Sequence, residues 1–157
     1  MHSLSSNNLI RLLQTFSEDE LKRFEKFLES PYYNTIANVK KLFRELRKYA
    51  PGFSGESFSR ENIWRGLFPG REFNYGILKN LLHELTILSQ EFLVAEETEN
   101  NIFLNEHILI GQLMNRNAGA MSVKKQKEFW KKFNAENKSL LRFLLWSILK
   151  ELEAAKP

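Results

Sequence analysis

The sequence predicts an all-α fold, a single helical domain of six to seven helices. Apolar residues recur roughly every three or four positions along most of the chain, which is the spacing of one helix face. Only 7 Gly and 4 Pro occur among the 157 residues, too few for a turn-rich all-β fold. Two helix starts of the same design also flank a sharp break at residues 68–70, a Phe-Pro-Gly sequence.

These two helix starts predict a rigid corner over residues 58–93 that resembles a helix–turn–helix. At each start a polar cap lies between two apolar residues. This arrangement, the hydrophobic staple, fixes the direction in which the chain enters the helix. The residues are Phe58, Ser59 and Ile63 at the first start, and Phe73, Asn74 and Leu78 at the second.

Three helices are predicted before this corner. The first covers about residues 6–15. The second follows a capping box at residues 17–20, and it ends at Ser30 because the next residue is a proline. An Asn34-Thr35 cap begins the third helix, and a Pro-Gly pair at 51–52 ends it.

Four further helices follow. An acidic loop at residues 96–99 separates the fifth helix from the sixth, Asn117-Ala118-Gly119 ends the sixth, and Ser122 caps the seventh. We therefore expect a helical domain over residues 1–119, and a long C-terminal helix over residues 120–157 that packs on it or on a partner. The predicted ranges of the four helices are 60–67, 75–93, 103–116 and 123–153.

The predicted core consists of apolar residues that repeat on one face of the second to fifth helices. It contains Phe24, Phe27, Phe43, Leu46, Ile63, Leu78, Leu81, Leu85, Leu88 and Phe92. An alternative to the purely helical fold is a winged helix, with a small β-hairpin near residues 92–104 in which residues 92–95 pair with residues 101–104.

Part of the chain resembles a known family. The residues concerned are Phe27-Leu28-Glu29-Ser30-Pro31-Tyr32-Tyr33-Asn34, Leu67-Phe68-Pro69-Gly70, Leu85 and Phe92-Leu93. They are similar to the N-terminal region of a family of uncharacterised, mostly helical proteins from Bacteroidetes, over roughly residues 10–95. The resemblance implies a helical fold and brings no catalytic residue. Members of that family generally continue further, so it also implies a short member or an N-terminal fragment.

No catalytic residue, cofactor site or metal site is predicted. The chain has no Cys and 3 scattered His. His83-Glu84 begins like the helix motif of zinc proteases, but Ile87 stands where the second histidine ligand is required. Neither a glycine-rich phosphate loop nor a Gly-x-Ser-x-Gly elbow occurs. The chain is therefore expected not to be an enzyme, and an enzyme without a recognisable motif stays an alternative.

The C-terminal helix predicts a protein-binding or scaffolding domain. Residues 140–152 are apolar on nearly every side, and such a helix must be buried all round. A protein partner or a second copy of the chain would bury it. The longest apolar stretch, residues 140–149, is far shorter than the roughly 20 residues that cross a bilayer, so we expect no membrane span and a cytoplasmic protein. The candidate interface residues are Leu141, Leu145, Trp146 and Leu149.

Nucleic-acid binding through the corner is the alternative function. The net charge is +4, and residues 101–157 carry 10 Lys and Arg against 5 acids. Lysines at the start of the seventh helix gather within an arc of about 160°. The corner itself holds four basic and four acidic residues, which supply little attraction for phosphates. The candidate contacts to an anionic surface are Lys124, Lys125, Lys127, Lys131 and Lys132.

Overall fold

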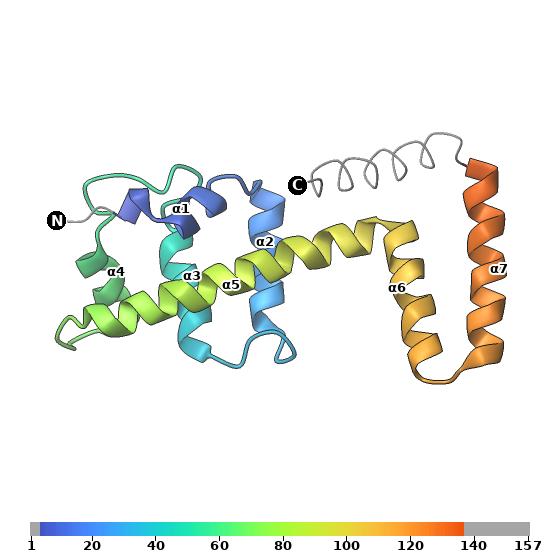
Figure 1. Cartoon of the computed structure of the whole chain (residues 1–157). Helices are drawn as coiled ribbons and strands as arrows, with labels where there is room; N and C mark the ends of the chain where they lie inside the picture. The colour runs from blue at the N-terminus through green and yellow to red at the C-terminus, as the bar shows by residue number, and fades with distance from the viewer. Residues whose placement is uncertain (1–3, 137–157) are drawn as a thin grey trace, which may run out of the picture. The chain divides into compact units, whose positions relative to one another are not determined.

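The computed structural model describes residues 4–136, and every regular element in this range is a helix (Figure 1). The all-α prediction of six to seven helices is confirmed for this part of the chain. The elements are a 3₁₀ helix η1 (Leu4–Ser6), α1 (Asn8–Leu13), α2 (Glu18–Glu29), α3 (Ala37–Arg47), α4 (Arg60–Leu67), α5 (Tyr75–Asn100), α6 (Ile102–Asn115) and α7 (Gly119–Glu136).

The chain divides into two compact units, Met1–Glu96 and Glu97–Pro157. The first contains η1, α1 to α4 and most of α5, and the second contains α6 and α7. The sequence-based boundary at residue 119 separates α6 from α7. In the structure the division falls earlier, because α6 and α7 pack against each other.

Local capping explains where the helices of the first unit begin. The Ser17 side chain accepts a hydrogen bond from the Glu20 N–H at 3.2 Å, and the Glu20 carboxylate accepts one from the Ser17 N–H at 2.7 Å. This confirms the predicted capping box. Hydrogen bonds from Ser17 lower the pKa of Glu20, which keeps its carboxylate charged at the positive end of α2. The Ser59 and Asn74 caps are also confirmed, at 3.2 and 3.0 Å.

The core of the first unit centres on the buried ring of Phe24. Phe24 packs edge-on against Phe43 of α3, with 4.9 Å between ring centroids, and lies 5.1 Å from Phe92 of α5. Phe16, in the turn before α2, lies 5.8 Å from Phe24 and 5.6 Å from Phe92. One aromatic cluster therefore joins α2, α3, α5 and the α1–α2 turn.

The ten predicted core residues all belong to this core, with Phe27 only half-buried at its edge. The prediction omitted further buried residues within the helices, such as Leu9, Leu21 and Leu42, and several residues outside the helices. The clearest is Phe53, which is fully buried although it lies in the loop after α3 and has a positive φ of 46°. Burial of a large ring stabilises a backbone conformation that a non-glycine residue rarely adopts.

The corner between α4 and α5 is closed by Trp64. Its indole Nε1–H donates to the Arg71 carbonyl at 3.1 Å, and its ring packs on Phe68 and Phe73. Gly70 has a φ of 75°, which a glycine adopts without strain. Phe73 stays 39% exposed and meets the Trp64 ring edge-on, so the second staple residue packs on the preceding helix.

The winged-helix alternative is wrong. Residues 92–100 continue α5, and α6 begins at Ile102, so residues 92–104 contain no strand. The predicted acidic loop at residues 96–99 is helical as well. Glutamate is a good helix former, and Glu96 is held by two hydrogen bonds from Arg23 Nε at 2.9 and 3.1 Å.

Two predicted caps are also wrong. Asn34 accepts a hydrogen bond from the Ile36 N–H at 2.9 Å, but this forms a turn before α3, whose N-cap residue is Ile36. Ser122 is buried inside the first turns of α7, because that helix begins at Gly119. In both places polar residues suited to capping lie close to the helix start, and the backbone begins the helix at another residue.

An ion-pair network joins the solvent-facing sides of α2 and α3. Glu25 accepts a hydrogen bond from Arg44 Nε at 2.9 Å and is also paired with Arg47. Arg44 bonds Glu29 at 2.7 Å, and Arg47 bonds Glu18 at 3.0 Å. The hydrogen bond from Arg44 and the charge of Arg47 lower the pKa of Glu25.

We predict that Phe24→Ala lowers the free energy of unfolding by about 3–5 kcal/mol, because it removes the ring shared by three helices. Urea unfolding followed by circular dichroism measures the change. Tyr32→Ala is the matched control, since that ring is 86% exposed and its loss should cost less than about 0.5 kcal/mol. Equal losses for the two variants would contradict this account of the core.

A second prediction concerns pH. Because the pKa of Glu25 is lower in the folded state than in the unfolded state, its contribution is present at neutral pH. That contribution is lost as the pH falls below about 4.3 and through the folded-state pKa. Glu25→Gln should therefore shrink the difference in stability between pH 7 and pH 3. Urea midpoints at both pH values test this, with Glu56→Gln in an exposed loop as the control. An unchanged difference for Glu25→Gln counts against the network.

Candidate functional site

The second unit is a hairpin of α6 and α7 built by its own local signals. Asn101 caps α6 by accepting a hydrogen bond from the Leu104 N–H at 3.0 Å. Asn117 adopts a φ of 56°, and the Ala118 N–H bonds the Leu113 carbonyl at 3.0 Å, which ends α6 in the usual left-handed manner. The predicted stop of this helix is confirmed.

Contacts between side chains of the two helices include an aromatic pair and an ion pair. The ring of Phe103 packs edge-on against Phe129 with 6.0 Å between centroids. Lys132 Nζ lies 2.6 Å from the Glu106 carboxylate. Among the described apolar residues of this unit only Ile110 is buried. Residues 97–132 therefore form no core comparable to that of the first unit.

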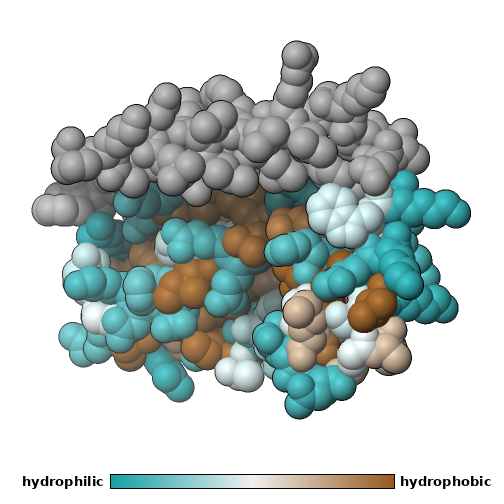
Figure 2. Space-filling view, turned by 45° about the vertical axis from the view of Figure 1, so that its right-hand side comes forward, coloured by the Kyte–Doolittle hydropathy of each residue, from teal (hydrophilic) through white to brown (hydrophobic). Residues whose placement is uncertain are grey.

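Large apolar side chains of the hairpin are exposed instead. They come from both helices and from several sides of α6. They are Ile102, Leu104, Ile108, Leu109 and Met114 on α6, and Met121, Val123 and Trp130 on α7, with exposed fractions from 38% to 63%. Figure 2 shows hydrophobic residues reaching the surface between hydrophilic ones. Such a density of exposed apolar residues is typical of an interaction surface.

One stripe of α6 lies opposite the side that packs on α7. At about 100° per residue, Leu104 and Ile108 point roughly 120° to 160° away from the buried Ile110. Gly111 continues the same stripe one turn further on, and a Cβ added there would meet nothing within 4 Å. The outer stripe, defined as Leu104, Ile108 and Gly111, is apolar and open to a second helix.

Electrostatics favour burial of this helix. Glu106 is the single Asp, Glu, Lys or Arg residue of α6, and Lys132 pairs with it. Another surface can therefore cover the outer stripe without burying an unpaired carboxylate or ammonium group.

The predicted lysine face of α7 is only partly available. Lys125 bonds Glu128 at 2.9 Å, and this hydrogen bond lowers the pKa of Glu128. Lys132 is paired with Glu106. The remaining lysines make no ion pair with a residue in the range 4–136, and they follow one face of α7 at spacings of three and four residues. They are Lys124, Lys127 and Lys131.

The predicted apolar interface lies outside the described residues. It comprises Leu141, Leu145, Trp146 and Leu149, so this prediction stays untested. The apolar side of α7 is itself partly exposed, with Val123 at 50% and Trp130 at 55%. Sequence reasoning missed the exposed apolar surface of α6. The pattern that could have revealed this surface is the placement of apolar residues on every side of that helix.

The structure also locates the exposed face of α5. Lys79, Asn80 and His83 are exposed, as expected for a helix that could enter a DNA groove. The connection from α4 to α5 spans residues 68–74, however, longer than the turn of roughly three or four residues in DNA-binding helix–turn–helix motifs. Residues Asn7 and Asn8 share a cavity with Lys79 and His83, so α5 does not present this face alone.

Within residues 4–136, no group of three or more His, Asp and Glu side chains is placed to hold a metal ion. No described helix has the length and apolar character needed to cross a membrane. A cytoplasmic location stays a prediction.

Comparison with known proteins found no matching family model, no similar curated protein and no similar solved structure. The resemblance to helical Bacteroidetes proteins therefore stays a prediction too.

Proposed function

We propose that this protein is a non-catalytic protein-binding or scaffolding domain that self-associates through α6. The observation that supports this most strongly is the apolar surface of that helix. Apolar residues surround α6, yet within residues 97–132 only Ile110 is a buried apolar residue. A helix of this kind is stable in water when a second surface covers it.

A second copy of the chain is the occupant that fits best. Two α-helical hairpins that pack face to face form a four-helix bundle, in which each hairpin supplies half of the core. A twofold axis near Ile108 would place each outer stripe on its counterpart. Gly111 lets the two helix backbones approach closely. The ion pair of Glu106 with Lys132 reduces electrostatic repulsion between the two copies.

We predict that the full chain sediments as a dimer and that Ile108→Glu weakens the dimer at least tenfold, since it places an unpaired carboxylate in the interface. Analytical ultracentrifugation over a range of concentrations measures this. Asn80→Glu is the control, because it adds the same charge on an exposed position of α5. Circular dichroism checks that each variant is folded. A wild-type chain that stays monomeric at high concentration ends the proposal.

Nucleic-acid binding is the second candidate, favoured by the row of Lys124, Lys127 and Lys131 on α7. These side chains could contact successive phosphates without reading the base sequence. If the domain binds only protein, a random DNA duplex should show no gel shift at physiological salt. A shift that weakens with added salt, and that is lost when the three lysines are changed to glutamine, would favour this alternative.

A further inference from the structure

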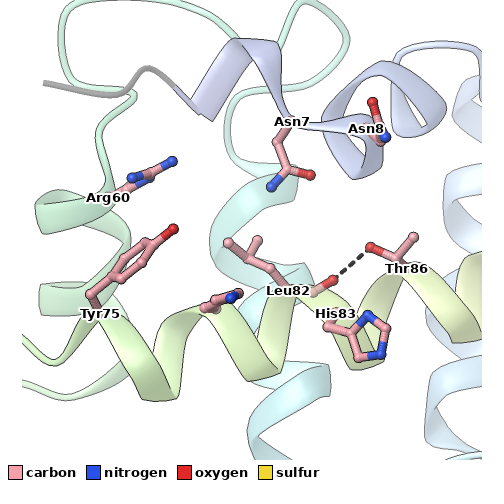
Figure 3. A pocket seen from close by; sticks show the side chains of 8 residues that line it. Asn7, Asn8, Arg60, Tyr75, Leu82, His83 and Thr86 are labelled. Atoms are coloured by element: carbon pink, nitrogen blue, oxygen red, sulfur yellow. Dashed lines mark hydrogen bonds between the residues drawn. The ribbon is translucent and has the colours of Figure 1, made fainter.

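The first unit contains a cavity of about 280 Å³ that neither the core nor the hairpin accounts for. It lies between the turn before α1, the start of α4 and one face of α5 (Figure 3). Tyr75, Lys79 and His83 line it from α5, where a spacing of four residues keeps them on one side of the helix. Arg60 and Asn7 line it from the other elements.

The Arg60 side chain is held in place by an aromatic ring, and one of its hydrogen-bond donors is unused within the described residues. Its guanidinium lies over the ring of Tyr75, with 5.0 Å between Cζ and the ring centroid. This contact orients the planar group. Its Nε–H is buried and donates to no acceptor among the described residues. A buried donor without an acceptor is costly, so a bound acceptor in this cavity would supply a hydrogen bond that the chain does not.

The other polar groups of the cavity also include unused donors. The Oδ1 of Asn7 accepts the Leu9 N–H at 2.9 Å, which leaves its amide nitrogen turned toward the space above α5 (Figure 3). Lys79 forms no ion pair within the described part of the chain. Thr86 is different, because its hydroxyl donates to the Leu82 carbonyl at 2.7 Å.

The charge of the cavity has one sign. Arg60 and Lys79 are cationic at neutral pH, His83 adds a further nitrogen donor or acceptor, and no Asp or Glu is among the residues that line the space. A cavity with two cations and an amide donor, and with no carboxylate, attracts an anion. Arginine binds two oxygens of one group through its fork, and lysine adds a point charge.

We propose that this cavity binds the phosphate group of a small phosphate monoester. A phosphate offers three terminal oxygens, enough to accept from Arg60, Lys79 and Asn7 together, whereas a carboxylate offers two. The volume lies just below the roughly 300 Å³ at which pockets for drug-sized ligands begin, so the rest of the ligand is small. The Tyr75 ring and Leu82 provide apolar surface for it. This site is independent of α6 and of self-association.

The test uses the full-length chain, with phenyl phosphate and inorganic phosphate as probes in isothermal titration calorimetry. We expect phenyl phosphate to bind more tightly than inorganic phosphate. Arg60→Gln should weaken its binding about ten- to a hundredfold, as loss of a charge-assisted hydrogen bond does. Lys79→Gln should weaken it as well. Arg65→Gln is the matched control, because Arg65 lies on the same helix, is exposed and does not line the cavity.

Circular dichroism shows whether each variant is folded, and Lys79→Gln tests the site if Arg60→Gln does not fold. A short DNA duplex is titrated in a parallel experiment, because its backbone phosphates offer the same kind of oxygen acceptors as phenyl phosphate. A duplex that binds while phenyl phosphate does not would overturn the proposal of a small ligand. Equal affinity of phenyl phosphate for wild type, Arg60→Gln and Lys79→Gln, or no binding to wild type, would overturn the site itself.

Discussion

The packing of Phe24 against rings from neighbouring elements is the contact on which the first unit depends. Its ring meets Phe43 of α3, Phe92 of α5 and Phe16 of the preceding turn, and it is completely buried. The helices of this unit are short, apart from α5, and short helices are marginal in water by themselves. Large rings shared between several helices provide the burial that each helix lacks alone. The ion pairs of Glu25 lie outside this cluster and orient α2 and α3 further.

The two units differ in how far they bury their apolar side chains. In the first unit most apolar residues of η1 to α5 form one core and even the loop residue Phe53 is enclosed, although Ile77, Ile87 and Val94 of α5 stay exposed. In the second unit the described apolar residues remain largely exposed, although α6 has more apolar character than α2, α3, α4 or α5. A unit with its own core has no physical need of a partner, whereas a hairpin with exposed Leu104 and Ile108 does. This contrast is why we place protein binding on α6 and α7.

The cavity beside α5 shows how a helix with one buried side can support polar residues on another side. One side of α5 supplies the core residues Leu78 and Leu85, and another side carries Tyr75, Lys79 and His83. The core contacts hold α5 in place, and this in turn fixes the polar side opposite Arg60 and Asn7. A rigid helix is a better support for a binding site than a loop, because its side chains keep their relative positions. Protein binding and anion binding would then be carried out by separate units.

Local patterns in the sequence were sufficient for the helices, most caps and part of the core. Ser17 with Glu20, Ser59 and Asn74 act through hydrogen bonds to residues at most three positions away, so their roles can be predicted from spacing alone. Contacts between distant residues could not be predicted in this way. Arg23 reaches Glu96 and supports a helix where a loop was expected. Arg60 lines one cavity with Asn7 and Lys79 only after folding. Side-chain chemistry and helical period are properties of the sequence, whereas the surfaces left exposed and the donors left unpaired depend on which helices the tertiary structure brings together.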